Sequence, residues 1–158
     1  MPEAQSRQQS VAGRGLADVQ VVVESVSDSG LTLTHQLVRG WHLVVVRGDL
    51  TVHSSQTLAE MLDSIVAAGG TRVIVDLARA STVEADCMHE LAATDRVLRE
   101  RAGDLRLVID GVATLHAIRI AGLTGRFEIH RYVGDIVGAV PGLDEGGRGM
   151  RRNGLPSG

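Results

Sequence analysis

Lysine is absent from this chain of 158 residues, cysteine occurs once, and phenylalanine, tryptophan and tyrosine occur once each. With Cys87 as the only cysteine, no internal disulfide can form, which fits a reducing compartment. Because these aromatic residues are so scarce, the core must consist of aliphatic side chains. All 16 basic residues are arginine, and the composition bias of a GC-rich genome explains this better than phosphate recognition does.

Long hydrophobic runs are also missing. No apolar stretch approaches the roughly 20 residues that a membrane-spanning helix needs, and the N-terminus lacks the charged-then-apolar pattern of a signal peptide. We therefore expect a cytoplasmic protein without membrane insertion. The net charge of −3 offers no broad attraction for nucleic acid, so nucleic acid is not expected as a partner.

The chain is long enough for one domain with a substantial core, and 44% of its residues are hydrophobic. Residues 1–18 are small and polar and are expected to be disordered, and residues 141–158 form a Gly- and Arg-rich flexible tail. Residues 31–140 are expected to form the domain. Residues 19–30 comprise a β-prone stretch and a turn, and the stretch either adds a strand to the sheet or mediates a homodimer.

An antiparallel hairpin opens the predicted domain. Residues 31–38 alternate at first, as a half-buried strand does, and Arg39-Gly40 marks a tight turn. The return strand, residues 42–47, contains an apolar run that is too continuous for a sheet edge, so it is expected in the middle of the sheet. The side chains predicted to share the buried face of the first strand are Leu31, Leu33 and Leu37.

The next segment predicts an amphipathic helix. Ser54 or Ser55 is expected to cap its start, and Gly69-Gly70 is expected to end it in the left-handed conformation. Apolar residues recur along one face at helical spacing, namely Leu58, Met61, Leu62, Ile65 and Val66.

Residues 71–109 predict a strand–helix–strand crossover. The β-branched run 73–75 ends at Asp76-Leu77, a polar loop follows, and a helical pattern runs from Met88 to a stop at Gly103. A second apolar strand spans residues 105–109. The unpaired N–H groups at the start of the helix make the loop before Met88 a natural place for an anion or a partner to dock.

Three short elements are expected after the crossover. They are a helix over 112–121 with Leu115 and Ile118 inward, a strand over 127–130 and a last helix over 133–140. The predicted fold class is therefore α/β, a mixed β-sheet with an N-terminal antiparallel hairpin and about four helices packed against it.

The segment EADCM, residues 84–88, resembles the STAS domain of bacterial anti-sigma factor antagonists. In that family an Asp-Leu strand end is followed, at a fixed distance, by Asp-Ser-Ser-Gly-Leu at a helix start. The register continues downstream through LRLVI, residues 105–109, and AIRIAGLTGRFEIH, residues 117–130. The similarity covers residues 31–140 and implies a STAS-like fold.

Laid on that motif without gaps, Glu84 takes the place of the family's Asp. Ala85 takes the place of the first serine, which the partner kinase phosphorylates. The second Ser, the Gly and the Leu of the motif correspond to Asp86, Cys87 and Met88. Since Ala85 has no hydroxyl group, the usual phosphorylation switch is impossible at this position.

A second motif lies upstream, in VVVRGDLTV, residues 44–52. It is similar to the family's Gly-x-Leu-Asp, with Gly48 and Leu50 matching and Thr51 where an Asp is usual. The resemblance implies a partner-binding loop formed by residues 84–89 (Glu84, Ala85, Asp86, Cys87, Met88 and His89), together with the neighbouring turn at Asp49 and Thr51.

Two interpretations of this loop stay open. Either it is locked in a binding-competent state because Ala85 cannot be phosphorylated, or the permanent charge of Asp86 imitates a phosphoserine and weakens kinase binding. A role of Asp86 as a helix N-cap is compatible with both. Ser81 and Thr82, in the same loop, are either alternative phosphorylation sites or ordinary polar residues.

The sequence offers little support for a catalytic site or a metal site. Cys87 and His89 supply two of the three or four ligands that zinc requires, and the acidic neighbours Glu84 and Asp86 oppose thiolate formation. A redox role of the thiol remains an alternative to a small residue in a glycine position. The six histidines are scattered, and no phosphate loop or nucleophile elbow occurs. We expect neither an enzyme nor a bound cofactor or metal.

The resemblance implies a regulatory protein that binds an anti-sigma factor with a kinase-like ATPase fold, and so influences sigma-dependent transcription. One alternative is a degenerate STAS scaffold subunit of a signalling or transporter assembly, which the loss of the phosphorylatable serine would favour. Another alternative is a STAS domain that binds a small ligand through the same loop.

Overall fold

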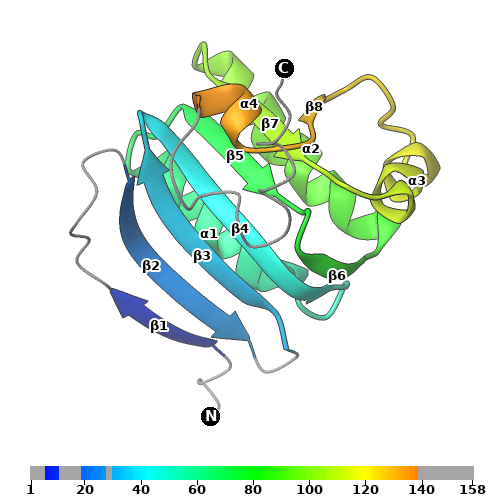
Figure 1. The fold of residues 1–158 in the computed structure, drawn as a ribbon, viewed down its shortest axis with the longest axis horizontal. Helices are drawn as coiled ribbons and strands as arrows, with labels where there is room; N and C mark the ends of the chain where they lie inside the picture. The colour runs from blue at the N-terminus through cyan, green and yellow to red at the C-terminus, as the bar shows by residue number, and fades with distance from the viewer. Residues whose placement is uncertain (1–5, 11–18, 28–29, 139–158) are drawn as a thin grey trace, which may run out of the picture.

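A computed structural model describes residues 6–10, 19–27 and 30–138, with side chains from residue 30 onward. Within these residues, eight strands form one sheet in the order β1-β2-β3-β4-β5-β7-β8, with β6 paired to the end of β4. Figure 1 shows the twisted sheet with α1 and α2 behind it and α4 in front of its upper end. The predicted α/β class, with its antiparallel hairpin and four helices, is confirmed.

The strands are β1 (Ser6–Ser10), β2 (Val19–Ser27), β3 (Thr32–Val38), β4 (Trp41–Leu50), β5 (Arg72–Asp76), β6 (Ala80–Val83), β7 (Asp104–Val108) and β8 (Glu128–His130). The helices are α1 (Ser55–Ala67), the short 3₁₀ helix η2 (Ala85–Cys87), α2 (Met88–Glu100), α3 (Val112–Ile120) and α4 (Gly134–Val137).

The predicted hairpin is β3 and β4, which pair antiparallel from Thr32 opposite Arg47 to Val38 opposite Trp41. Arg39 and Gly40 both have positive φ, at 49° and 87°, as a two-residue turn that matches the twist of the strands requires. The β-prone stretch before the hairpin is β2, which pairs antiparallel with β3. Strand β1 lies within the segment expected to be disordered and pairs with β2.

Strand β4 occupies the centre of the sheet, as its continuous apolar run predicted. It pairs antiparallel with β3 on one side and parallel with β5 on the other. Strands β7 and β8 continue the parallel part, because each follows a helix that returns the chain to the same end of the sheet.

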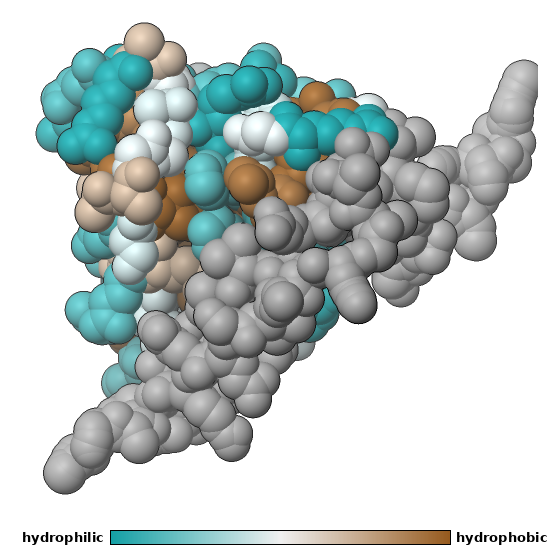
Figure 2. All heavy atoms as spheres, turned by 90° about the vertical axis from the view of Figure 1, so that its left-hand side faces the viewer, coloured by the Kyte–Doolittle hydropathy of each residue, from teal (hydrophilic) through white to brown (hydrophobic). Residues whose placement is uncertain are grey.

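Apolar side chains cover both faces of the sheet. The larger cluster joins the strands to α1 and α2 and includes Leu33, Val44, Leu62 and Leu91. The smaller cluster, on the opposite face, contains Val38, Trp41, Leu43, Val45, Ile74, Val108 and Val133, with residues of α4 packed against it. In a view from the left-hand side of Figure 1, hydrophobic atoms are visible between hydrophilic ones in the upper part of the described molecule (Figure 2).

The single tryptophan is buried in the smaller cluster and is 6% exposed. The guanidinium carbon of Arg72 lies 4.7 Å from the centre of the Trp41 ring, and that of Arg106 lies 5.2 Å from it. Two cations therefore contact the aromatic ring at distances typical of cation–π interactions. The contact links the start of β4 with β5 and β7.

Three sequence predictions need correction. Leu115 is 44% exposed rather than inward. The buried face of α3 is centred between Ala117 and Ile118, and at 100° per residue this centre lies about 110° around the helix from Leu115. The last helix is shorter than predicted and ends before Gly138, whose φ is 90°, while residues 139–140 lie outside the described part. Residues 80–83, expected to be loop, form β6.

A histidine pair lies between the strands of the hairpin. His35 Nε2 and His42 Nδ1 are 3.0 Å apart and share one proton in a hydrogen bond. Burial, and then the nearby His42, lower the pKa of His35 from its usual 6.5 to about 4. Burial also lowers the pKa of His42.

We therefore expect stability to fall as the pH drops from 6.5 towards 4. In that window the unfolded chain binds a proton on His35 that the folded chain does not bind, so acid favours unfolding, and the loss is complete below the folded pKa. Urea unfolding of wild type and His35→Gln between pH 7 and pH 5 should show a smaller pH dependence for the variant. The control His89→Gln removes an exposed histidine, and a pH dependence equally reduced in both variants would contradict the assignment.

Candidate functional site

Two separate segments of the chain meet at one end of the sheet. The last residues of β4 leave β5 and pair with β6 instead, which sets Asp49 beside Thr82 and Leu50 beside Val83. Residues 49–54, the end of β4 and the turn after it, therefore lie against residues 81–88, before and at the start of α2 (Figure 1). The two motifs that carry the family resemblance are thus brought together.

Gly48 makes this change of partner feasible. The register of β4 and β6 shifts between Gly48 and Asp49, and Gly48 has a φ of 95°, which side chains disfavour. A Cβ atom at this position would lie 2.3 Å from the carbonyl oxygen of Gly30. The match to a family glycine at Gly48 thus has a local steric reason.

The turn after β4 is held by the hydroxyl of Ser54, which is 1% exposed. This hydroxyl accepts a hydrogen bond from the amide of Thr51 at 3.0 Å and donates one to the carbonyl of Asp49 at 2.8 Å. The Thr51 hydroxyl accepts from the amide of His53 at 3.1 Å. Ser54 occupies the N-cap position of α1 but makes no side-chain cap bond, because its hydroxyl stabilises the turn instead.

Glu84 links the two segments. Its Oε1 atom accepts a hydrogen bond from the amide of Val52 at 2.9 Å, and its own amide donates to the carbonyl of Leu50 at 3.0 Å. A carboxylate that accepts from a backbone amide forms a charge-assisted bond, which is stronger than a neutral one. Glu84 therefore fixes the turn after β4 relative to the start of α2.

Two residues of the predicted partner-binding loop, Cys87 and Met88, belong to the core rather than to the surface. Cys87 is 1% exposed and Met88 is fully buried, so neither side chain offers a contact surface in this state. Burial, and further the charges of Glu84, Asp86 and Glu90, raise the pKa of the Cys87 thiol, although a hydrogen bond with Ser55 opposes this. The thiol lies 3.8 Å from the carbonyl oxygen of Leu50.

Asp86 is exposed and lies within η2 rather than at a cap. Residue 84 occupies the N-cap position of η2, and residue 87 that of α2, with no side-chain cap bond at either. The N-cap interpretation of Asp86 is therefore wrong, because a 3₁₀ turn precedes the α-helix. Ala85, in the same turn, is partly exposed.

The exposed side of the assembled segments is acidic. Residues 49–54 and 81–90 contain four carboxylates and no arginine, and all four are exposed, namely Asp49, Glu84, Asp86 and Glu90. His53 and His89 are exposed beside them. We call these six residues, with Thr51 and Ala85, the acidic surface. Ser81 and Thr82 are also exposed, on β6, and their phosphorylation stays a prediction.

Helix α3 lies against β6 and η2, next to the acidic surface. Its outward face is apolar at three positions, Val112 at 81%, Leu115 at 44% and Ile120 at 63% exposed. Val52, in the turn after β4, is 51% exposed. The sequence pattern assigned Leu115 to the core and gave no sign of this apolar face.

Within the described ranges, no three side chains of the His, Cys, Asp and Glu types lie close enough together to hold a metal ion. Among the helices of this part of the chain, none combines the length and apolarity needed to cross a membrane.

The STAS domain family matches residues 34–136, which is more than half of the chain. No curated protein sequence matches significantly.

The solved structures with a similar fold include two anti-sigma factor antagonists and one Bacillus cell fate determinant. An anti-sigma factor antagonist from Mycobacterium paratuberculosis has a TM-score of 0.62 at 23% identity, covering 70% of this chain and 93% of its own. The anti-sigma factor antagonist SpoIIAA in its unphosphorylated form has a TM-score of 0.53 at 14% identity, covering 65% and 91%. The phosphorylated form of the Bacillus cell fate determinant SpoIIAA has a TM-score of 0.50 at 17% identity, covering 63% and 90%.

We predict that Glu84→Ala loosens the turn after β4. The amide of Val52 loses its acceptor, so its hydrogen exchange should accelerate about tenfold or more. Asp86→Ala is the matched control, since it removes the carboxylate two residues further along the chain, which makes no hydrogen bond within the described residues. Exchange measured residue by residue by NMR checks this, and an unchanged rate at Val52 in Glu84→Ala would show that the bond does not hold the turn.

Proposed function

Because this chain belongs to the STAS domain family, we propose that it is an anti-sigma factor antagonist-like regulatory protein. It binds an anti-sigma factor of the serine-kinase type and so influences sigma-dependent transcription, without a serine phosphorylation switch at residue 85. The antagonists of similar fold support the proposal at the level of architecture alone. The stronger support is the acidic surface formed where the two motif segments meet.

The acidic surface is suited to protein recognition because its backbone is already fixed. Glu84 joins the two segments at 2.9 Å, and the Ser54 hydroxyl closes the turn at Asp49. A partner therefore meets an ordered surface and loses little free energy in ordering it. This arrangement supports the interpretation that the loop is locked in its binding-competent state.

Charge and apolar area together indicate the kind of partner surface. Four exposed carboxylates, with no arginine in residues 49–54 or 81–90, favour a basic patch on the partner, and complementary charge speeds association. The exposed apolar residues of α3, Val112 and Leu115 among them, adjoin this surface and can supply the dehydrated centre that protein interfaces need. The contact surface we propose is the acidic surface together with the outward face of α3.

We predict that Asp86→Arg weakens binding to the cognate anti-sigma factor by about tenfold or more, because it places like charge against a basic patch. The measurement is calorimetry with each purified anti-sigma factor of the kinase type from the same genome. Glu100→Arg, at the exposed far end of α2, is the matched control and should leave affinity unchanged. If none of the candidates binds the wild-type protein, or if both variants lose affinity equally, the proposed surface is wrong.

The phosphorylation switch can be tested with the same partner. Incubated with the kinase and ATP, wild type should take up no phosphate, whereas Ala85→Ser should be phosphorylated and should then dissociate, because a phosphate adds about −1.5 to −2 charges at the interface. Mass spectrometry locates the phosphate, and Ala93→Ser on the exposed side of α2 is the control. Phosphate on wild-type Ser81 or Thr82 would instead reveal a different switch.

Asp86→Ser separates the two interpretations of the loop. If Asp86 imitates a phosphate, its replacement should tighten binding to the anti-sigma factor. An unchanged or slightly weaker affinity supports the locked loop, in which Asp86 contributes only to the charge of the surface.

A further inference from the structure

A pocket lies at the opposite end of α2 from the acidic surface. Its volume is about 410 Å³, and it is lined by Arg99, Asp104, Arg106, Gly125, Arg126, Phe127 and Glu128. Arg99 follows Met88 by eleven residues along α2, so the pocket is roughly 17 Å from the start of that helix. It is therefore a separate feature from the proposed partner surface.

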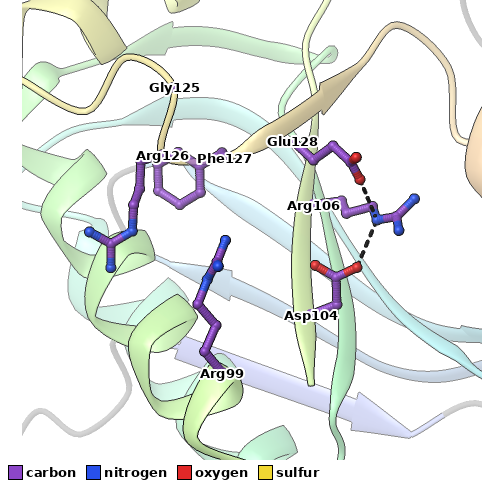
Figure 3. Close-up of a pocket in the computed structure, with 7 residues that line it drawn as sticks. All are labelled: Arg99, Asp104, Arg106, Gly125, Arg126, Phe127 and Glu128. Atoms are coloured by element: carbon purple, nitrogen blue, oxygen red, sulfur yellow. Dashed lines mark hydrogen bonds and ion pairs between the residues drawn. The ribbon is translucent and has the colours of Figure 1, made fainter. Parts of the chain in front are cut away.

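Two arginines on one side of the pocket share a single carboxylate. Arg99 Nε donates to Asp95 Oδ2 at 2.9 Å, and Arg126 Nε donates to the same oxygen at 3.1 Å. The Asp95 side chain is 0% exposed, whereas those of Arg99 and Arg126 are 58% and 34% exposed. The buried carboxylate thus holds two partly exposed guanidinium groups. Figure 3 shows the side chains of these two arginines, Arg99 and Arg126, among the residues that line the pocket.

Both arginines keep hydrogen-bond donors that a ligand could use. Each arginine contacts Asp95 through Nε. The two terminal amino groups of each arginine have no hydrogen-bond partner within the part of the chain that the structure describes. Separating either arginine from Asp95 is unfavourable, because it leaves a buried charge less well paired. The guanidinium groups are therefore preorganised, and two adjacent forks of N–H donors suit an oxyanion.

The other side of the pocket supplies acceptors. Arg106 Nε lies 2.9 Å from both Asp104 Oδ2 and Glu128 Oε1, as Figure 3 shows. Each carboxylate uses one oxygen for this contact and keeps a second one. The group of Arg106 with two carboxylates carries one net negative charge, whereas the group of Asp95 with two arginines carries one net positive charge. The pocket, at the β7–β8 edge of the sheet, thus has donors on the α2 side and acceptors around Arg106, whose guanidinium group also contacts Trp41 on the other face of the sheet.

We propose that this pocket binds a small phosphate monoester that carries hydroxyl groups, such as a sugar phosphate. The phosphate contacts the terminal amino groups of Arg99 and Arg126, because its three terminal oxygens match two forks better than the two oxygens of a carboxylate do. The hydroxyl groups donate to the remaining oxygens of Asp104 and Glu128. The volume lies within the range of small-molecule sites.

The test is a titration of the full chain with glucose 6-phosphate, inorganic phosphate, glucose and acetate, followed by NMR. Glucose 6-phosphate should shift the Nε–Hε signals of Arg99 and Arg126 saturably, at concentrations below about 20 mM. Inorganic phosphate should shift the same signals more weakly, and glucose and acetate should not shift them. This measurement needs no variant, so it does not depend on whether a variant folds.

Two variants then test the assignment. Arg99→Gln should weaken glucose 6-phosphate binding about tenfold, since Arg126 still pairs with Asp95 while one fork is lost. Arg96→Gln, an exposed arginine of the same helix outside the pocket, should leave the affinity unchanged. The proposal is overturned if no probe shifts these signals, if inorganic phosphate binds as tightly as the ester, or if both variants weaken binding equally. None of these results bears on partner binding at the acidic surface.

Discussion

The change of partner by β4 at Gly48 is the constraint on which the rest of this structure depends. A single strand pairs with β5 along its first half and with β6 at its end, and the bulge between them requires a backbone conformation and a closeness to Gly30 that only glycine permits. The last pair with β5 is Val45 opposite Asp76, where β5 ends, and the bulge then brings the end of β4 onto β6 and residues 49–54 towards the start of α2. The site thus arises from a local departure from regular sheet geometry, and its side chains only complete what the backbone has arranged.

The framework of the fold was predictable because its signals are local and periodic. The spacing of Leu58, Met61, Leu62 and Ile65 predicted α1, and all four are buried. The turn at Arg39-Gly40 and the central place of β4 followed from residue types that tolerate few alternatives. Strand β6 escaped prediction because Ala80–Val83 is only four residues long, and its middle residues, Ser81 and Thr82, are exposed. Its pairing is decided by the bulge in β4, which lies more than 30 residues away in the sequence.

The candidate site was predicted in outline, through resemblance, but its internal contacts were not. Nothing in the sequence indicates that Glu84 accepts from the amide of Val52, since the two residues are 32 positions apart. Cys87 and Met88 belong to the predicted loop by sequence, yet the 3₁₀ turn of η2 directs both into the core. The pairing of Asp95 with Arg99 could have been predicted, because residues four apart lie side by side on a helix. The contact of Asp95 with Arg126, 31 residues later, depends on how the chain returns from α3 to β8.

The position of Trp41 gives the molecule an optical property of its own. The only tryptophan of the chain is enclosed by two guanidinium groups on the sheet face that carries α4, whereas α1 and α2 cover the other face. Its fluorescence therefore reports the integrity of β4, β5 and β7 without a label. A partner that docks at the start of α2 leaves this emission unchanged as long as the sheet stays intact, and a change in emission on binding would be the signature of a rearranged sheet.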